Sequence, residues 1–166
     1  MRFGLISRSS TIIVLAMLFT APSQSAAQFP YGAPGHESAL SIPTAQLIQA
    51  EELNRLLENK SAEKPLVLQV GSHVLFAESH IKWAEYAGPG SQPAGLNLLQ
   101  QRVSMLSRKT LIVLYCGCCP WNRCPNLGPA FWQLHDMGFT RVKVLYLANN
   151  FGADWVSKGY AVEQGR

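Results

Sequence analysis

Several features that would place a chain in a broad class of protein are missing from this sequence of 166 residues. It has no run of basic residues longer than a pair, and 14 basic residues are offset by 10 acidic ones, so we expect no nucleic-acid ligand. Its longest apolar run is shorter than the roughly 20 residues that a transmembrane helix needs. It shows no internal repeat and no low-complexity segment, which argues against a repeat protein.

The N-terminal region has the pattern of a secretory signal peptide. Residues 1–10 carry two arginines and no acidic residue, residues 11–21 form a short apolar run, and small residues follow up to Ala27. We therefore expect residues 1–27 to be removed, with no stable membrane anchor left and the mature protein periplasmic or secreted. Residues 28–44 are rich in Pro, Gly and Ser and are predicted to form an N-terminal arm or linker.

The remaining residues, 45–166, alternate between helical and strand patterns and predict a single domain. Leucines at helical spacing mark 49–59 and 96–106, and further helices are predicted at 129–137 and 153–158. Short, nearly continuous apolar runs predict buried strands at 65–70, 110–115 and 142–147. We interpret 71–95, with its Gly-Pro-Gly breaker, as irregular. The alternation predicts an α/β fold with an open, mostly parallel sheet and helices on both faces.

Cysteine is absent from the chain except in one loop, where four occur within nine residues. The loop follows the predicted strand 110–115, and ligands of open parallel sheets bind beyond the carboxyl ends of the strands. Cys116 directly follows the strand and is the candidate nucleophile, because the N-terminus of the next helix, capped by Asn126, would favour its thiolate. Arg123 is a candidate anion-binding residue, since its guanidinium offers a fixed positive charge.

Taken together, these segments resemble the rhodanese family over most of residues 44–163. The resemblance is carried by Leu-Ile-Val-Leu-Tyr-Cys at 111–116, Leu-His-Asp-Met-Gly-Phe-Thr-Arg-Val at 134–142, Trp-Val-Ser-Lys-Gly-Tyr-Ala-Val-Glu at 155–163, the strand at 66–70 and His-Ile at 80–81. It implies a rhodanese-like domain at 45–166 and a sulfurtransferase or persulfide-carrier activity. Cys116 would take a sulfane sulfur from a donor such as thiosulfate or a persulfide and pass it to a thiol.

The cysteine loop departs from the family pattern, which runs from the cysteine through four residues to an arginine and then to Ser or Thr. Counted from Cys116, Arg123 comes two residues after the position of the family's arginine. Counted from Cys118, Arg123 matches that position, but Cys124 stands where the family has Ser or Thr. The loop is therefore enlarged. Gln69 stands where the family usually has an aspartate.

The additional cysteines, Cys118, Cys119 and Cys124, leave several functions open. They could form structural disulfides, which an oxidising compartment would favour, or they could resolve a persulfide on Cys116. The Cys-x-x-Cys spacing of Cys116 and Cys119 is also that of thiol–disulfide oxidoreductases. Crowded soft thiolates could alternatively hold a metal such as Cu(I), and a loop locked by disulfides or metal could serve as a non-catalytic binding module.

Among these alternatives, the sequence favours sulfur transfer. The expected partners are a small sulfur donor and a thiol acceptor, the latter either small or a periplasmic protein. We expect neither a cofactor nor a bound metal.

Overall fold

The structure is a computed structural model in which residues 42–61 and 63–165 are described. The predicted signal peptide, and all but the last residues of the predicted arm, lie outside these described residues. Within the described part of the chain, no helix is both long and apolar enough to cross a membrane.

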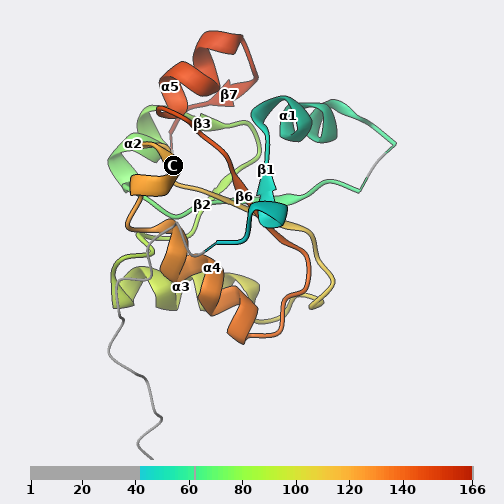
Figure 1. Ribbon diagram of the computed structural model, residues 1–166, viewed down its shortest axis with the longest axis vertical. Helices are drawn as coiled ribbons and strands as arrows, with labels where there is room; N and C mark the ends of the chain where they lie inside the picture. Colours follow the sequence, from blue (N-terminus) through green and yellow to red (C-terminus); the bar gives the residue numbers. More distant parts are fainter. Residues whose placement is uncertain (1–41, 62, 166) are drawn as a thin grey trace, which may run out of the picture. The chain divides into compact units, whose positions relative to one another are not determined.

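A five-stranded sheet forms the centre of the fold, and all of its neighbouring strands are parallel (Figure 1). The strand order is β1-β6-β5-β2-β4, which places β5 in the middle of the sheet. A separate antiparallel pair joins β3 to β7. The strands are β1 (Leu47–Ile48), β2 (Leu66–Gln69), β3 (His80–Ile81), β4 (Glu85–Tyr86), β5 (Ile112–Tyr115), β6 (Val142–Leu145) and β7 (Val162–Glu163).

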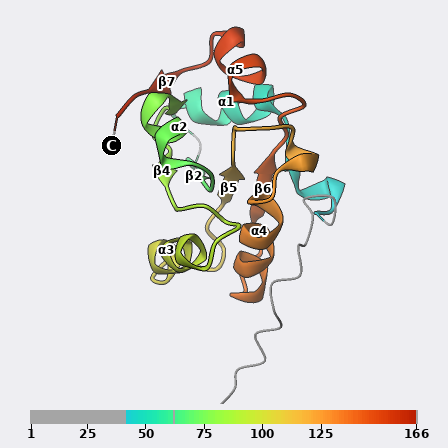
Figure 2. The same ribbon diagram turned by 90° about the vertical axis from the view of Figure 1, so that its left-hand side faces the viewer.

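Helices cover both faces of this sheet, as Figure 2 shows. The helices α3 and α4 pack on one face, while α1, α2 and α5 pack on the other. The α-helices are α1 (Ala50–Glu58), α2 (His73–Glu78), α3 (Pro93–Val103), α4 (Leu127–Asp136) and α5 (Phe151–Asp154). The described residues also form three short 3-10 helices: η2 (Thr44–Gln46) before α1, η3 (Trp121–Arg123) before α4 and η4 (Val156–Lys158) after α5.

The central strand β5 is buried on both faces, which explains its continuous apolar sequence. Ile112 and Leu114 belong to the core on the α3–α4 side, and Val113 and Tyr115 belong to the core on the opposite side. This alternation is the two-residue period of a strand. Cys116, the next residue, returns to the α3–α4 side.

The structure confirms the alternating α/β pattern and corrects it in two places. The segment 71–95 is not irregular, because it contains α2, β3 and β4. These elements are short, and α2 contributes only Phe76 to the core, so their periodicity is weak in the sequence. The predicted helix at 153–158 is two shorter helices, α5 and η4, interrupted at Trp155. Gly138 and Gly159 follow helix ends, with φ of 85° and 74°.

Candidate active site

Cys116 lies at the carboxyl end of the central strand, where the sequence places it. Its side chain is buried, with 2% of its surface exposed. The backbone turns sharply at the next residue, Gly117, whose φ of 87° is in the left-handed region that favours glycine. The carbonyl of Gly117 accepts a hydrogen bond from the Phe151 backbone N–H at 3.0 Å, which ties the cysteine loop to the start of α5.

The fold brings the sulfur atoms of the loop together. Cys116 Sγ lies 3.3 Å from Cys118 Sγ, which in turn lies 3.1 Å from Cys119 Sγ. The sulfurs of Cys116, Cys118 and Cys124 all lie within 4.8 Å of one another and could be metal ligands. Cys116 and Cys124 are buried, whereas Cys118 is exposed. All four cysteines are free in the structure, so the disulfides that were one of the alternatives are not seen.

Hydrogen bonds among the thiols place the negative charge of the cluster on Cys118. The bonds from Cys116 and Cys124 lower the pKa of Cys118 well below its ordinary value. The bond to Cys118 raises the pKa of Cys116, and bonds to Cys116 and Cys118 raise that of Cys124. Burial, together with the bond to Cys118, raises the pKa of Cys119 to about 12. These hydrogen bonds therefore favour negative charge on Cys118 over the other three cysteines.

Asn126 holds Cys116 from the helix side. It directly precedes α4, as predicted, but its side chain does not cap the helix. Instead, its Nδ2 donates to Cys116 Sγ at 3.3 Å and its Oδ1 accepts from the Ser91 backbone N–H at 2.9 Å. The amide donor stabilises negative charge on the Cys116 sulfur. Asn126 therefore links the cysteine loop to the loop that follows β4.

Gln69, at the end of β2, supports the backbone of the site. Its side chain is 2% exposed, and its Nε2 donates to the Cys116 carbonyl at 3.0 Å. Its Oε1 accepts from the Gly71 backbone N–H at 3.1 Å. A side chain at Gly71 would collide with the site, because its Cβ would lie 2.9 Å from Cys116 Sγ. Sequence reasoning noted Gln69 only as a departure from the family and missed this role.

We expect Gln69→Leu to lower the free energy of unfolding by about 2–4 kcal/mol, since two buried backbone groups lose their partner. Urea denaturation measures the change. Gln133→Leu is the matched control, because Gln133 makes one bond, to the Leu96 carbonyl at 2.8 Å, at a partly buried position. The control should lose only about 1 kcal/mol. Wild-type stability in Gln69→Leu would contradict this role.

Arg123 is exposed in η3, whereas Cys124, the residue that follows it, is buried beside the other sulfurs. The structure thus brings Cys118 and Cys124 to Cys116, and leaves the arginine on the solvent side of the loop. Its contact with an anion stays a prediction. Its position permits contact with an anion that approaches from solvent.

A pocket of about 470 Å³ adjoins Cys116 and Gly117. Its walls come from the end of β2, from α2, from α5 and η4, and from the segment around β7. Apolar side chains dominate, and Glu78 is the one charged residue among those that line it. The lining residues are Gln69, Leu75, Glu78, Ser79, Tyr115, Cys116, Gly117, Phe151, Gly152, Val156, Val162 and Gln164. A small, largely apolar molecule could therefore bind next to Cys116.

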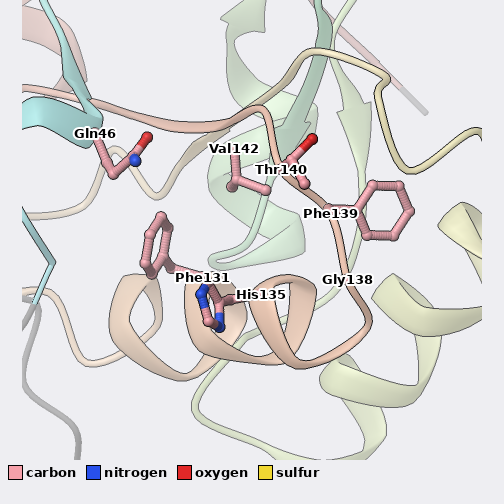
Figure 3. A pocket seen from close by; sticks show the side chains of 7 residues that line it. All are labelled: Gln46, Phe131, His135, Gly138, Phe139, Thr140 and Val142. Carbon is pink, nitrogen blue, oxygen red and sulfur yellow. The ribbon is translucent and has the colours of Figure 1, made fainter.

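A second pocket, of about 360 Å³, lies near the start of β6 (Figure 3). Phe131 and His135 reach into it from α4, and Thr140 and Val142 lie opposite. This pocket is at the amino end of β6, whereas the cysteine cluster follows the carboxyl end of β5. Its lining contains no cysteine, lysine, arginine or acidic residue. The groups suited to covalent chemistry therefore gather at the cysteine loop.

Comparison with solved structures identifies the fold. The chain is similar to the BH2092 protein from Bacillus halodurans, with 24% identity, a TM-score of 0.55 and coverage of 71% of this chain and 76% of that one. It is also similar to the rhodanese-like domain of Alr3790 from Anabaena sp., with 22% identity, a TM-score of 0.53 and coverage of 72% and 79%. The predicted rhodanese-like α/β fold is confirmed.

A structure of EanB, described as a cysteine persulfide in a tetrahedral intermediate state with ergothioneine, shares this fold. It is 20% identical, with a TM-score of 0.53, and the match covers 71% of this chain but 28% of that one. No protein-family model and no curated protein matches the sequence.

Proposed function

We propose that this chain is a sulfurtransferase or persulfide carrier that holds a sulfane sulfur on Cys116. The observation that carries the proposal is the position of Cys116, which directly follows the carboxyl end of the central strand and is one of the residues that line the 470 Å³ pocket. The rhodanese-like fold and the persulfide described for EanB support the same chemistry.

In the loading step, Cys116 loses its proton to solvent, and its thiolate attacks the sulfane sulfur of the donor. A new S–S bond forms, and the donor's bond to that sulfur breaks with its electron pair on the departing fragment, which is sulfite when thiosulfate is the donor. In the unloading step, an acceptor thiolate attacks the outer sulfur, and Cys116 leaves as a thiolate. The Asn126 amide stabilises the anionic sulfur in both steps.

The acceptor in this proposal is a small thiol in the pocket or a cysteine of a periplasmic protein. The compartment follows from the predicted signal peptide, and the transfer needs neither a cofactor nor nucleic acid. Because Arg123 is exposed, its role would be to attract an anionic donor to the loop before reaction.

The full chain, reduced and then incubated with thiosulfate or a persulfide donor, tests the proposal by intact-protein mass spectrometry. We expect the mass to rise by one sulfur atom and the added sulfur to be lost on addition of a thiol. No gain with either class of donor would overturn the proposal.

A thiol–disulfide redox protein is the second candidate, favoured by the 3.3 Å separation of Cys116 Sγ and Cys118 Sγ. A small movement would bring the two sulfurs to the bond length of about 2.05 Å. Two electrons and two protons would pass to the disulfide of a partner, which becomes a dithiol. The sequence suggested Cys119 as the second cysteine of such a pair, but the sulfur of Cys119 contacts that of Cys118.

Cys118→Ser separates the two candidates. We expect this variant to load one sulfur to the same final extent as the wild type, since Cys116 and not Cys118 carries the sulfur in the proposed transfer. Its rate of reducing a disulfide substrate should fall at least about 100-fold if the pair is Cys116 and Cys118. Complete loss of sulfur loading together with unchanged disulfide reduction would contradict both assignments.

A further inference from the structure

We propose that Cys116, Cys118 and Cys124 form a three-coordinate site for one Cu(I) ion. Their three sulfur atoms lie within 4.8 Å of one another, although the residues are separated along the loop. A metal–thiolate bond is about 2.3 Å long, so a trigonal centre places its sulfurs about 4 Å apart. The spacing in the reduced loop therefore needs only a small adjustment to accept an ion.

The chemistry of the donors selects a soft ion. The group contains sulfur alone, with no histidine or carboxylate, and soft thiolate ligands favour Cu(I). Cys116 and Cys124 belong to the apolar core on the α3–α4 side, which keeps water and oxygen ligands away from that side of the ion. Cys118 is exposed and gives the ion a route of entry.

The number of sulfurs argues against zinc, which takes four ligands in structural sites. Cys119 is not among the three mutually close sulfurs, and the sulfur that it contacts is that of Cys118. The sulfur of Cys116 also accepts a hydrogen bond from the Asn126 amide Nδ2. That donor offsets the negative charge that three thiolates bring to one monovalent ion.

This site goes beyond sulfur transfer, because it requires Cys124, for which the transfer steps have no role. A bound ion would occupy the Cys116 sulfur, so copper binding and sulfur loading would exclude each other. Binding replaces thiol protons by the metal, so it releases protons.

The test is a titration of the full chain, reduced and under anaerobic conditions, with Cu(I) in competition with a chromophoric Cu(I) chelator. We expect one ion per chain in the wild type. Cys118→Ser and Cys119→Ser form a matched pair of neighbouring substitutions outside the buried core. The first should weaken Cu(I) binding at least about 100-fold, and the second should change it less than about threefold.

Cys124→Ala tests the buried ligand, and alanine keeps this apolar position apolar. It should also weaken binding at least about 100-fold, with far-UV circular dichroism and the melting temperature confirming that it folds. Each of three results would overturn the three-sulfur site: absence of Cu(I) binding in the wild type, full Cu(I) binding by Cys124→Ala, or equal losses of Cu(I) affinity in Cys118→Ser and Cys119→Ser. So would displacement of the Cu(I) by one equivalent of Zn²⁺. Sulfur loading of Cys124→Ala is followed separately by mass spectrometry. Loading without any Cu(I) binding would mean that the copper site fails while the proposed function holds.

Discussion

Cys116→Ser is expected to abolish persulfide formation, with loading by thiosulfate or a persulfide donor slowed at least about 1,000-fold. A hydroxyl at this position is not ionised at neutral pH and cannot retain a sulfane sulfur. Bonds from Cys116 and Cys124 lower the pKa of the neighbouring Cys118, but this residue is exposed and is not among the residues that line the pocket. Mass spectrometry after timed incubation with donor measures the loss directly.

Cys119→Ser is the matched control for this substitution. Cys119 lies in the same loop, but its sulfur contacts Cys118, and its pKa is raised by burial. It should load sulfur within about threefold of the wild-type rate. Both variants should keep the wild-type melting temperature to within a few degrees, because serine is close in size to cysteine. Loading by Cys116→Ser at the rate of the control would remove Cys116 from the reaction.

The second large effect concerns stability: Trp155→Ala should lower the free energy of unfolding by about 3–5 kcal/mol. Trp155 is fully buried, at 0% exposure, in the core on the α1, α2 and α5 side. Its ring stacks with Phe151 and meets Tyr160 edge-on at a centroid distance of 5.0 Å. Its Nε1 donates to the Ala161 carbonyl at 3.2 Å. Removing the ring leaves a cavity beneath α5, which forms one wall of the pocket.

Trp83→Ala provides the comparison, since Trp83 is 56% exposed and its ring is contacted by Lys64 and Lys82. It should cost less than about 1 kcal/mol, because exposed cation–π contacts contribute little. Urea denaturation of both variants gives the two values. Equal losses would mean that Trp155 does not anchor the core in the way the structure shows.

The longer elements and the position of Cys116 could be predicted from the sequence because their physical signals are local. Continuous apolar runs identify β2, β5 and β6, which are buried on both faces, and leucines at helical spacing identify α1 and α3. Cys116 directly follows β5, so predicting the end of this strand also predicts that Cys116 lies at the carboxyl edge of the sheet. The fold is needed to distinguish the buried ring of Trp155 from the exposed ring of Trp83.

Features that depend on contacts between distant segments could not be predicted in this way. The helix α2 and the strands β3 and β4 are too short to show a period, and β3 forms only by pairing with β7, some 80 residues later in the chain. The bridging role of Gln69 requires β2 and β5 to be neighbours.

The arrangement of the sulfur atoms could likewise not be predicted from the sequence. Cys-x-x-Cys spacing suggested Cys119 as the partner of Cys116, but the left-handed turn at Gly117 brings Cys118 Sγ to 3.3 Å instead. Asn126 was expected to cap α4. Its side chain instead donates to Cys116 Sγ and accepts from the Ser91 N–H, which belongs to the loop after β4. Loop geometry of this kind is set by the packing of the whole domain and not by local propensity.

The central claim, that Cys116 carries the sulfur, is tested most directly by locating the added atom. The full chain is loaded with donor, the remaining thiols are blocked, and the peptide containing Cys116, Cys118 and Cys119 is fragmented in the mass spectrometer. The account predicts that the extra sulfur resides on Cys116, with Cys118 and Cys119 carrying only the blocking group. An extra sulfur on Cys118, or none on any of the three residues, would contradict it.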